Sequence, residues 1–202
     1  GVMWMGEVPL RAIFGVIGAM LLFAAFATLF SSYRSDRFLY LNPWNDGENG
    51  YGNGYQIIHS YYAFSEGGIF GVGLGNSREK YLYLPESETD FIFAIIGEEL
   101  GLIGALAVIA VFLVFLWSGM RIARAAYDDF GAMVAGSLTI MLVFQAFLNI
   151  GCAIGVFPTT GKPLPFISSG GSSLIASFMM AGIILSVSEG ADKKKVFERR
   201  RD

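Results

Sequence analysis

Five carboxylates are concentrated in residues 84–101, which read LPESETDFIFAIIGEELG. Three are alternate acids at the end of a polar loop, and two lie in the apolar run that follows: Glu86, Glu88, Asp90, Glu98 and Glu99. Acidic side chains at the mouth of a membrane span, or inside it, are costly unless they are paired or functional. The pattern therefore predicts a polar cavity that opens at one face of a membrane and supports chemistry or transport.

Basic residues suited to phosphate oxygens lie on both sides of this acidic cluster. Residues 71–75 read GVGLG and are followed by Arg78 and Lys80, while Lys162 is the one cation of a later loop. Glycines let backbone amides approach an anion, and Lys or Arg supplies the charge. The stretch lacks the strand–turn–helix context of a nucleotide fingerprint. Phosphate contact and an ordinary turn therefore both stay open.

A second irregular stretch, residues 157–173, reads FPTTGKPLPFISSGGSS. Its three prolines break any helix, and irregular backbone persists at membrane depth only where it lines protein or a wet cavity. A structural re-entrant turn explains the prolines well. The candidate substrate contacts in this stretch are Lys162, Ser168, Gly170, Gly171 and Ser172.

The elements that must position these residues are membrane-spanning helices. The chain is 54% hydrophobic, and four uncharged stretches have at least 19 residues each. About 20 apolar residues cross the hydrocarbon core as a helix, in which the backbone is satisfied internally. We predict an all-α membrane protein, one membrane domain over residues 1–202, with four transmembrane helices at about 10–31, 90–120, 131–157 and 169–188.

The orientation follows from Lys and Arg. Nine of the 14 fall on the side that holds both termini and five on the other side, so both termini are predicted to be cytoplasmic. Residues 31–90 and the loop around 158–172 would then face outward. The basic C-terminal tail also fits contact with anionic membrane lipid.

Within the outer loop, residues 55–66 read YQIIHSYYAFSE and show helical amphipathicity. We expect a helix that lies at the membrane interface or re-enters the bilayer and shapes the cavity, an assignment favoured over catalysis by His59. Its polar face would carry Gln56, His59 and Ser60. A single histidine and a single cysteine exclude a multi-histidine metal site and a disulfide framework. No basic, aromatic-interleaved patch supports nucleic-acid binding.

Three segments together resemble the SEDS family of bacterial shape, elongation, division and sporulation proteins, FtsW, RodA and SpoVE. They are LNPWNDG, GYQIIHSYYAFSEGGIFGVGLGNSREKYLYLPESETDFIFAIIGEELG and FPTTGKPLPFISSGGSS. The stretches GLGNSREK and IIGEELG look more like the division member FtsW than like RodA. Three positions depart from the family pattern: Ser87 and Glu88, where Ala-His is frequent, and Ser169, where Tyr is common.

The resemblance implies a ten-helix protein of the bacterial inner membrane that polymerises peptidoglycan glycan strands from lipid II. The four spans would be helices seven to ten, which agrees with the topology read from charge. The chain begins with Gly1 without a signal peptide, and we expect it to be a C-terminal part that is inactive alone. The implied partners are lipid II, the growing glycan strand, a class B penicillin-binding protein (a transpeptidase) and other division proteins.

The resemblance also identifies Asp90 as the essential aspartate. Glycosyl transfer needs a base for the acceptor 4-hydroxyl while a lipid pyrophosphate leaves the donor. An exposed aspartate is a weak base because its pKa is low. Desolvation and repulsion from Glu86 and Glu88 are expected to raise the pKa of Asp90. Glu86 is also a candidate substrate contact. The leaving pyrophosphate would be neutralised by cations: Arg78, Lys80, Lys162 and a possible divalent ion, Mg²⁺ or Mn²⁺.

Other assignments stay open for these acids. Asp90 is well suited to cap a helix starting at Phe91. Glu98 lies about 80° and Glu99 about 180° from Asp90 around that helix, so Glu98 is the candidate to support Asp90. Both glutamates are expected to form buried hydrogen bonds.

Two other function classes remain. A flippase for lipid-linked sugars would need polar residues through the depth of its spans, and outside the Glu98–Glu99 pair the strong ones are Gln145 and Asn149. A non-enzymatic division scaffold explains the helices and leaves the acidic cluster unexplained.

Overall fold

The computed structural model describes residues 15, 18–19, 43–45, 54–85 and 87–199. These residues form helices and loops, with no strand among them, which confirms the all-α prediction for the described part of the chain. The elements are the 3-10 helix η2 (Pro43–Asn45) and the helices α4 (Tyr55–Gly67), α5 (Glu79–Leu82), α6 (Ile92–Ala125), α7 (Asp129–Ala153) and α8 (Gly171–Arg199).

Three helices are long and apolar enough to cross a membrane: α6, α7 and the Gly171–Gly190 part of α8. They correspond to three of the four predicted spans. The fourth, residues 10–31, lies outside the described residues except for residues 15, 18 and 19. α6 and α8 continue beyond their predicted ends, because charge limits the apolar run but not the helix. α7 ends at Ala153, earlier than predicted, and Gly155 soon after it has a positive φ of 71°.

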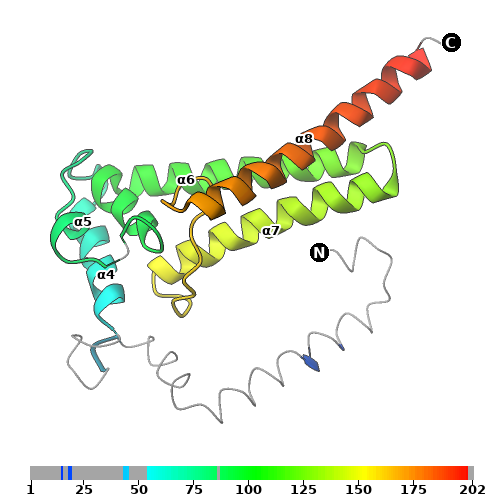
Figure 1. Ribbon diagram of the computed structural model, residues 1–202. Coiled ribbons are helices and arrows are strands. Elements are labelled where there is room, and N and C mark those ends of the chain that lie inside the picture. Colours follow the sequence, from blue (N-terminus) through cyan, green and yellow to red (C-terminus); the bar gives the residue numbers. More distant parts are fainter. Residues whose placement is uncertain (1–14, 16–17, 20–42, 46–53, 86, 200–202) are drawn as a thin grey trace.

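The three long helices run alongside one another, and the loops between them gather at two ends (Figure 1). The segment before α6 and the loop from α7 to α8 lie at the same end as α4 and α5. A buried apolar cluster connects them there, with Ala63 of α4, Phe93 of α6, Ile150 of α7 and Leu164 of the loop. This end of the bundle therefore holds every described residue that the sequence singled out for chemistry.

α6 is broken at Gly101, whose φ of 67° and ψ of −166° are not helical. A break frees two carbonyls before it and two amides after it, which an unbroken helix would pair with each other. Residues 68–73 satisfy all four groups from outside the helix. The bonds join Val72 N to Glu98 O (2.9 Å), Gly73 N to Glu99 O (3.0 Å), Leu102 N to Gly68 O (2.9 Å) and Ile103 N to Ile69 O (3.4 Å).

Glycine is required where these two backbones meet. Gly71 and Gly101 both have positive φ, and a Cβ on either would collide with the backbone of the opposite segment. Irregular backbone near a membrane is tolerated when its polar groups are satisfied within the protein. Gly71 and Gly101 therefore allow residues 68–73 to pair with the free backbone groups of α6 at its break.

α4 confirms the predicted helix within a residue at its end, but its polar face is not as predicted. Ile57 and Ile58 are buried, as expected, whereas Ser60 is also fully buried. The Ser60 hydroxyl donates to the carbonyl of Ala153 at 2.5 Å. A small side chain whose hydroxyl finds a carbonyl can be buried at low cost, so Ser60 belongs to the packed face. The short helix α5 was not predicted from the sequence.

Candidate functional site

Two loops meet around Asp90: the acidic segment, residues 84–90, and the second loop, residues 154–170. The Ser168 hydroxyl donates to the carbonyl of Thr89 at 2.5 Å, and the Ser169 amide donates to the carbonyl of Glu88 at 2.8 Å. Ser168 also accepts a bond from the Leu164 amide at 2.7 Å. Ser168, a predicted substrate contact, thus lies beside the acidic segment, but its buried hydroxyl joins the two loops. Glu86 lies outside the described residues.

The side chain of Asn149 in α7 forms hydrogen bonds to the same two loops. Its amide nitrogen donates to the carbonyls of Asp90 and Lys162, both at 2.8 Å. The side chain is only 1% exposed. One turn earlier, the amide of Gln145 donates to the carbonyl of Pro163 at 2.9 Å. From the sequence, these two amides were candidates only for a translocation path. The sequence did not indicate that Asn149 bonds to the backbone of both Asp90 and Lys162.

Asp90 lies against the second loop through its side chain as well. Its Oδ2 atom is 3.7 Å from the position that a Cβ would occupy on Gly161. Gly161 has a positive φ of 64° and carries no side chain to cover the carboxylate from that direction. The neighbouring Lys162 side chain is exposed. A carboxylate and a cation are therefore carried on adjoining backbone.

The alternative assignment of Asp90 as a helix cap assumed that the helix starts at Phe91, but the helix starts one residue later. α6 begins at Ile92 and its N-cap position is Phe91, which supplies no side-chain cap. Asp90 is thus one residue before the cap position.

At the start of α8, Gly171 and Ser172 are exposed and Gly170 is half-buried, and the Gly170 carbonyl accepts from the Leu174 amide at 2.8 Å. Helix N-termini favour anions, which keeps their predicted role in substrate contact physically reasonable.

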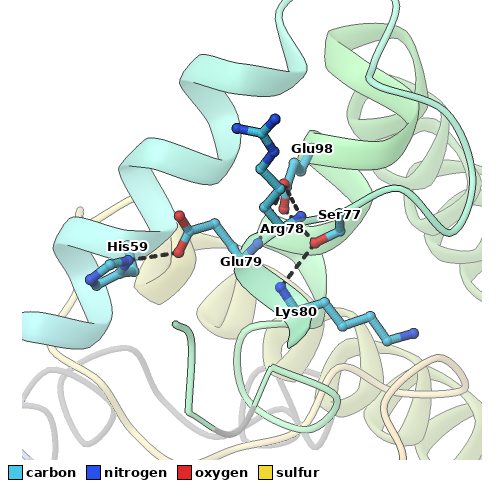
Figure 2. Close-up of polar contacts among 6 residues, drawn as sticks. All are labelled: His59, Ser77, Arg78, Glu79, Lys80 and Glu98. Atoms are coloured by element: carbon cyan, nitrogen blue, oxygen red, sulfur yellow. Dashed lines mark hydrogen bonds and ion pairs between the residues drawn. The ribbon is translucent and has the colours of Figure 1, made fainter. Parts of the chain in front are cut away.

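The other predicted cations lie on the cation-bearing segment, residues 77–80, which Glu98 of α6 holds (Figure 2). Glu98 is fully buried. Its two oxygens accept bonds from the Ser77 hydroxyl at 2.5 Å and from the Arg78 amide at 2.8 Å. The predicted burial and hydrogen bonding of Glu98 is confirmed. The bonds described for it serve the cation-bearing segment, whereas the sequence had suggested support of Asp90.

The side chains of Arg78 and Lys80 extend to different sides of this segment (Figure 2). Arg78 is exposed, and the Lys80 ammonium lies 5.8 Å from the ring centre of Tyr81. The amides of residues 71–73 donate to carbonyls of the protein itself. The amides of Val72 and Gly73 bond to α6 and the Gly71 amide bonds to Gly67, so these contacts favour the alternative of a turn over phosphate contact for residues 71–73.

A His–Glu pair joins α4 to α5. The Nδ1 atom of His59 lies 2.6 Å from Oε2 of Glu79, and the imidazole stacks on Tyr83 with 5.6 Å between ring centres. Burial of Glu79 raises the pKa of its carboxyl above the ordinary value, although the bond and charge of His59 oppose the shift. The nearby carboxylates of Glu98 and Glu66 add to the rise. His59 thus supports the cation-bearing segment.

The donor set does not identify a metal centre. Among the described residues, no three His, Cys, Asp or Glu side chains are grouped closely enough to hold one ion. We therefore assign no metal ligand, and the predicted divalent cation takes no part in the chemistry below.

Comparison with known proteins gives a consistent assignment. The protein-family model described as "Cell cycle protein", for FtsW, RodA and SpoVE, matches residues 1–193. A probable peptidoglycan glycosyltransferase FtsW of Geobacter metallireducens is 47% identical over 179 residues, which are 88% of this chain and 47% of the relative. The stage V sporulation protein E of Bacillus subtilis is 50% identical over 161 residues, 79% of this chain and 43% of the relative.

More distant relatives agree. A probable peptidoglycan glycosyltransferase FtsW of Mycobacterium tuberculosis is 43% identical over 185 residues, 91% of this chain and 35% of the relative. The chain thus spans less than half the length of these three relatives. A solved structure described as "Structural coordination of polymerization and crosslinking by a peptidoglycan synthase complex" superposes with a TM-score of 0.70 at 26% identity, covering 94% of this chain and 52% of that one. This chain belongs to the FtsW/RodA/SpoVE (SEDS) family of multi-pass membrane proteins.

Proposed function

We propose that this chain supplies the reactive loops of a membrane glycosyltransferase that polymerises peptidoglycan glycan strands from lipid II during bacterial cell division. Relatives at 43–47% identity are named probable peptidoglycan glycosyltransferase FtsW. The single observation that carries the proposal is the Asn149 amide, which bonds the carbonyls of both Asp90 and Lys162. It keeps a potential base and a potential cation on adjoining loops.

In this mechanism Asp90 accepts the proton of the acceptor 4-hydroxyl as the hydroxyl oxygen attacks the anomeric carbon of the donor. A new C–O bond forms, and the bond from that carbon to the lipid pyrophosphate breaks, so the pyrophosphate leaves with the electron pair. A positioned base of this kind contributes about 10²- to 10⁴-fold to the rate. Gly161 leaves room beside the Asp90 carboxylate for the acceptor hydroxyl.

Cations would stabilise the charge that develops on the leaving group. Lys162, exposed on the second loop, is the nearest candidate by backbone connection to Asp90. Arg78 and Lys80 are further candidates on the cation-bearing segment. Compact ammonium and planar guanidinium groups both bind phosphate oxygens in proteins.

We further propose that this end of the bundle faces outward, since Lys and Arg predominate on the opposite side of the membrane. A crosslinking transpeptidase of class B is the proposed partner. The solved relative comes from a peptidoglycan synthase complex that coordinates polymerization and crosslinking. An Asn76→Cys variant should react with an impermeant thiol reagent in intact spheroplasts, and reaction only after lysis would reverse the orientation.

The flippase alternative loses support from the described contacts. The mid-span amides of Gln145 and Asn149 are bonded to carbonyls of the second loop and do not line a described path. The decisive experiment gives fluorescent lipid II to the purified full-length protein in vesicles. The proposal expects glycan polymer, a flippase would translocate lipid II without polymer, and a scaffold would do neither.

A further inference from the structure

The glycine-rich segment, residues 68–74, has a surface that its backbone role does not use. Its side chains are apolar, and three of them project from the protein: Ile69 is 60% exposed, Phe70 82% and Leu74 76%. Large apolar side chains gathered on one exposed segment mark an interaction surface. The segment and its flanking glycines contain no charged residue between Glu66 and Arg78.

Hydrogen bonds fix the depth of this segment along α6. They pair residues 68–73 with residues 98–103 of α6, on both sides of the break at Gly101. The uncharged run of α6 begins there and covers residues 100–120, about the length that crosses the hydrocarbon core. The glycine-rich segment therefore lies where the hydrocarbon core of the membrane begins.

The neighbouring surface of α6 has the same character. Leu100, Leu102 and Ile103, beside the break, are exposed apolar residues of a membrane-spanning helix. The exposed side chains of the glycine-rich segment extend this exposed apolar surface. The amides of residues 71–73 and the carbonyls of Gly68 and Ile69 are already paired, so this backbone can enter the boundary of a bilayer without unsatisfied polar groups.

We propose that residues 68–74 form a wedge that inserts the side chains of Ile69, Phe70 and Leu74 into the phospholipid leaflet at this end of the bundle. The occupant of this surface is the region of glycerol and upper acyl chains. The cation-bearing segment begins after only two intervening residues, Gly75 and Asn76, so the wedge holds Arg78 and Lys80 at the membrane surface, where phosphate groups of lipids lie. The wedge itself does not depend on the proposed glycosyl transfer.

Site-directed fluorescence tests the wedge in the full-length protein. Phe70→Cys and Leu74→Cys, each in a background without other reactive cysteines, are labelled with an NBD fluorophore and reconstituted in phosphatidylcholine–phosphatidylglycerol vesicles. The matched control is Asn76→Cys, since Asn76 is exposed and polar and lies two residues beyond the wedge. Thermal unfolding of each labelled variant verifies that it is folded.

Labels at positions 70 and 74 should lose most of their fluorescence to phosphatidylcholine carrying a nitroxide high on its acyl chain, and little to aqueous iodide. The label at position 76 should show the reverse. Two results would overturn the wedge. Quenching at position 70 by iodide alone would mean that the segment is in water, and quenching by neither reagent would mean that another part of the protein covers it.

Discussion

The acidic segment and the cation-bearing segment are held by the same device with opposite polarity. In each, one buried polar side chain of a long helix bonds the backbone of a loop that carries reactive groups. Asn149 of α7 donates to carbonyls of the acidic segment and the second loop. Glu98 of α6 accepts from Ser77 and from the Arg78 amide.

This difference in the supporting side chains predicts that the two segments depend differently on pH. A neutral amide that donates to carbonyls does not titrate, so the neighbourhood of Asp90 should be held equally at all moderate pH values. The cation-bearing segment instead contains a titratable support, the Glu79 carboxyl bonded to His59. Loops that carry reactive groups are thus fixed through bonds to their backbone.

Removal of Glu98 should have the largest effect on stability. Glu98→Ala leaves the Ser77 hydroxyl and the Arg78 amide without their acceptor, at about 1–3 kcal/mol for each buried donor. Glu98→Gln keeps an acceptor oxygen and should cost about 1 kcal/mol. Denaturation in detergent measures both. The adjacent Glu99→Ala is the control, since Glu99 Oε1 has no described hydrogen-bond partner. Equal losses at positions 98 and 99 would refute the role of Glu98.

Removal of the Asn149 amide should affect activity more than stability. Asn149→Leu removes the amide that bonds the carbonyls of Asp90 and Lys162, at about 1–3 kcal/mol, and removes this connection between the two loops. Gln145→Leu, the matched control, removes a bond only to Pro163. Glycan synthesis by the full-length protein should fall much further for Asn149→Leu. If both variants polymerise equally well, Asn149 is only a packing residue.

The Glu79 carboxyl should make the cation-bearing segment sensitive to pH. Burial raises its pKa in the folded protein above the ordinary 4.5, so the folded state binds this proton more readily than the unfolded state. The resulting stability is fully present below about pH 4.5 and is lost as the pH rises through the folded-state pKa. The stability of the wild type relative to Glu79→Gln should therefore decrease from pH 4 upward. A difference that is constant, or that grows with pH, contradicts this assignment.

A pair of glycines should give the smallest and most specific effect. Gly161→Ala and Gly75→Ala both force an L residue into positive φ, 64° and 79°, at about 1 kcal/mol each. A Cβ at position 161 would lie 3.7 Å from Asp90 Oδ2, whereas one at position 75 would meet nothing within 4 Å. Stability losses should match, and glycan synthesis should fall only for Gly161→Ala. Equal activity of the two variants would remove Gly161 from the site.

The long helices could be predicted because uncharged runs of sufficient length have few alternatives in a membrane. The break in α6 could not be predicted, since a glycine inside an apolar span is ordinary. Its partners are residues 68–73, about 30 positions earlier along the chain. The sequence shows only that the glycines of that segment make its backbone flexible. Flexibility does not distinguish a backbone that binds an anion from one that pairs with the free groups of a broken helix.

The residues that hold the loops, Asn149, Ser168 and Glu98, are recognisable in the sequence as polar groups in apolar surroundings. Their hydrogen-bond partners could not be predicted. Asn149 and Ser168 bond backbone carbonyls, and every residue has a carbonyl, so such a partner has no sequence signature. Glu98 similarly bonds a backbone amide, and helical spacing alone suggested a partnership with Asp90. The types of the reactive residues are readable in the sequence, while their grouping depends on backbone contacts.

The most direct measurement is lipid II polymerisation by the full-length protein with Asp90→Asn. Asn keeps the shape and can still cap a helix, but it removes the carboxylate that would accept the proton. Insertion and thermal stability should be unchanged, while glycan synthesis falls by about 10²- to 10⁴-fold. Asp90→Ala should be equally inactive, and Glu88→Gln, at an exposed side chain, should retain activity. Polymerisation by Asp90→Asn at near the wild-type rate would contradict the assignment of Asp90 as the base.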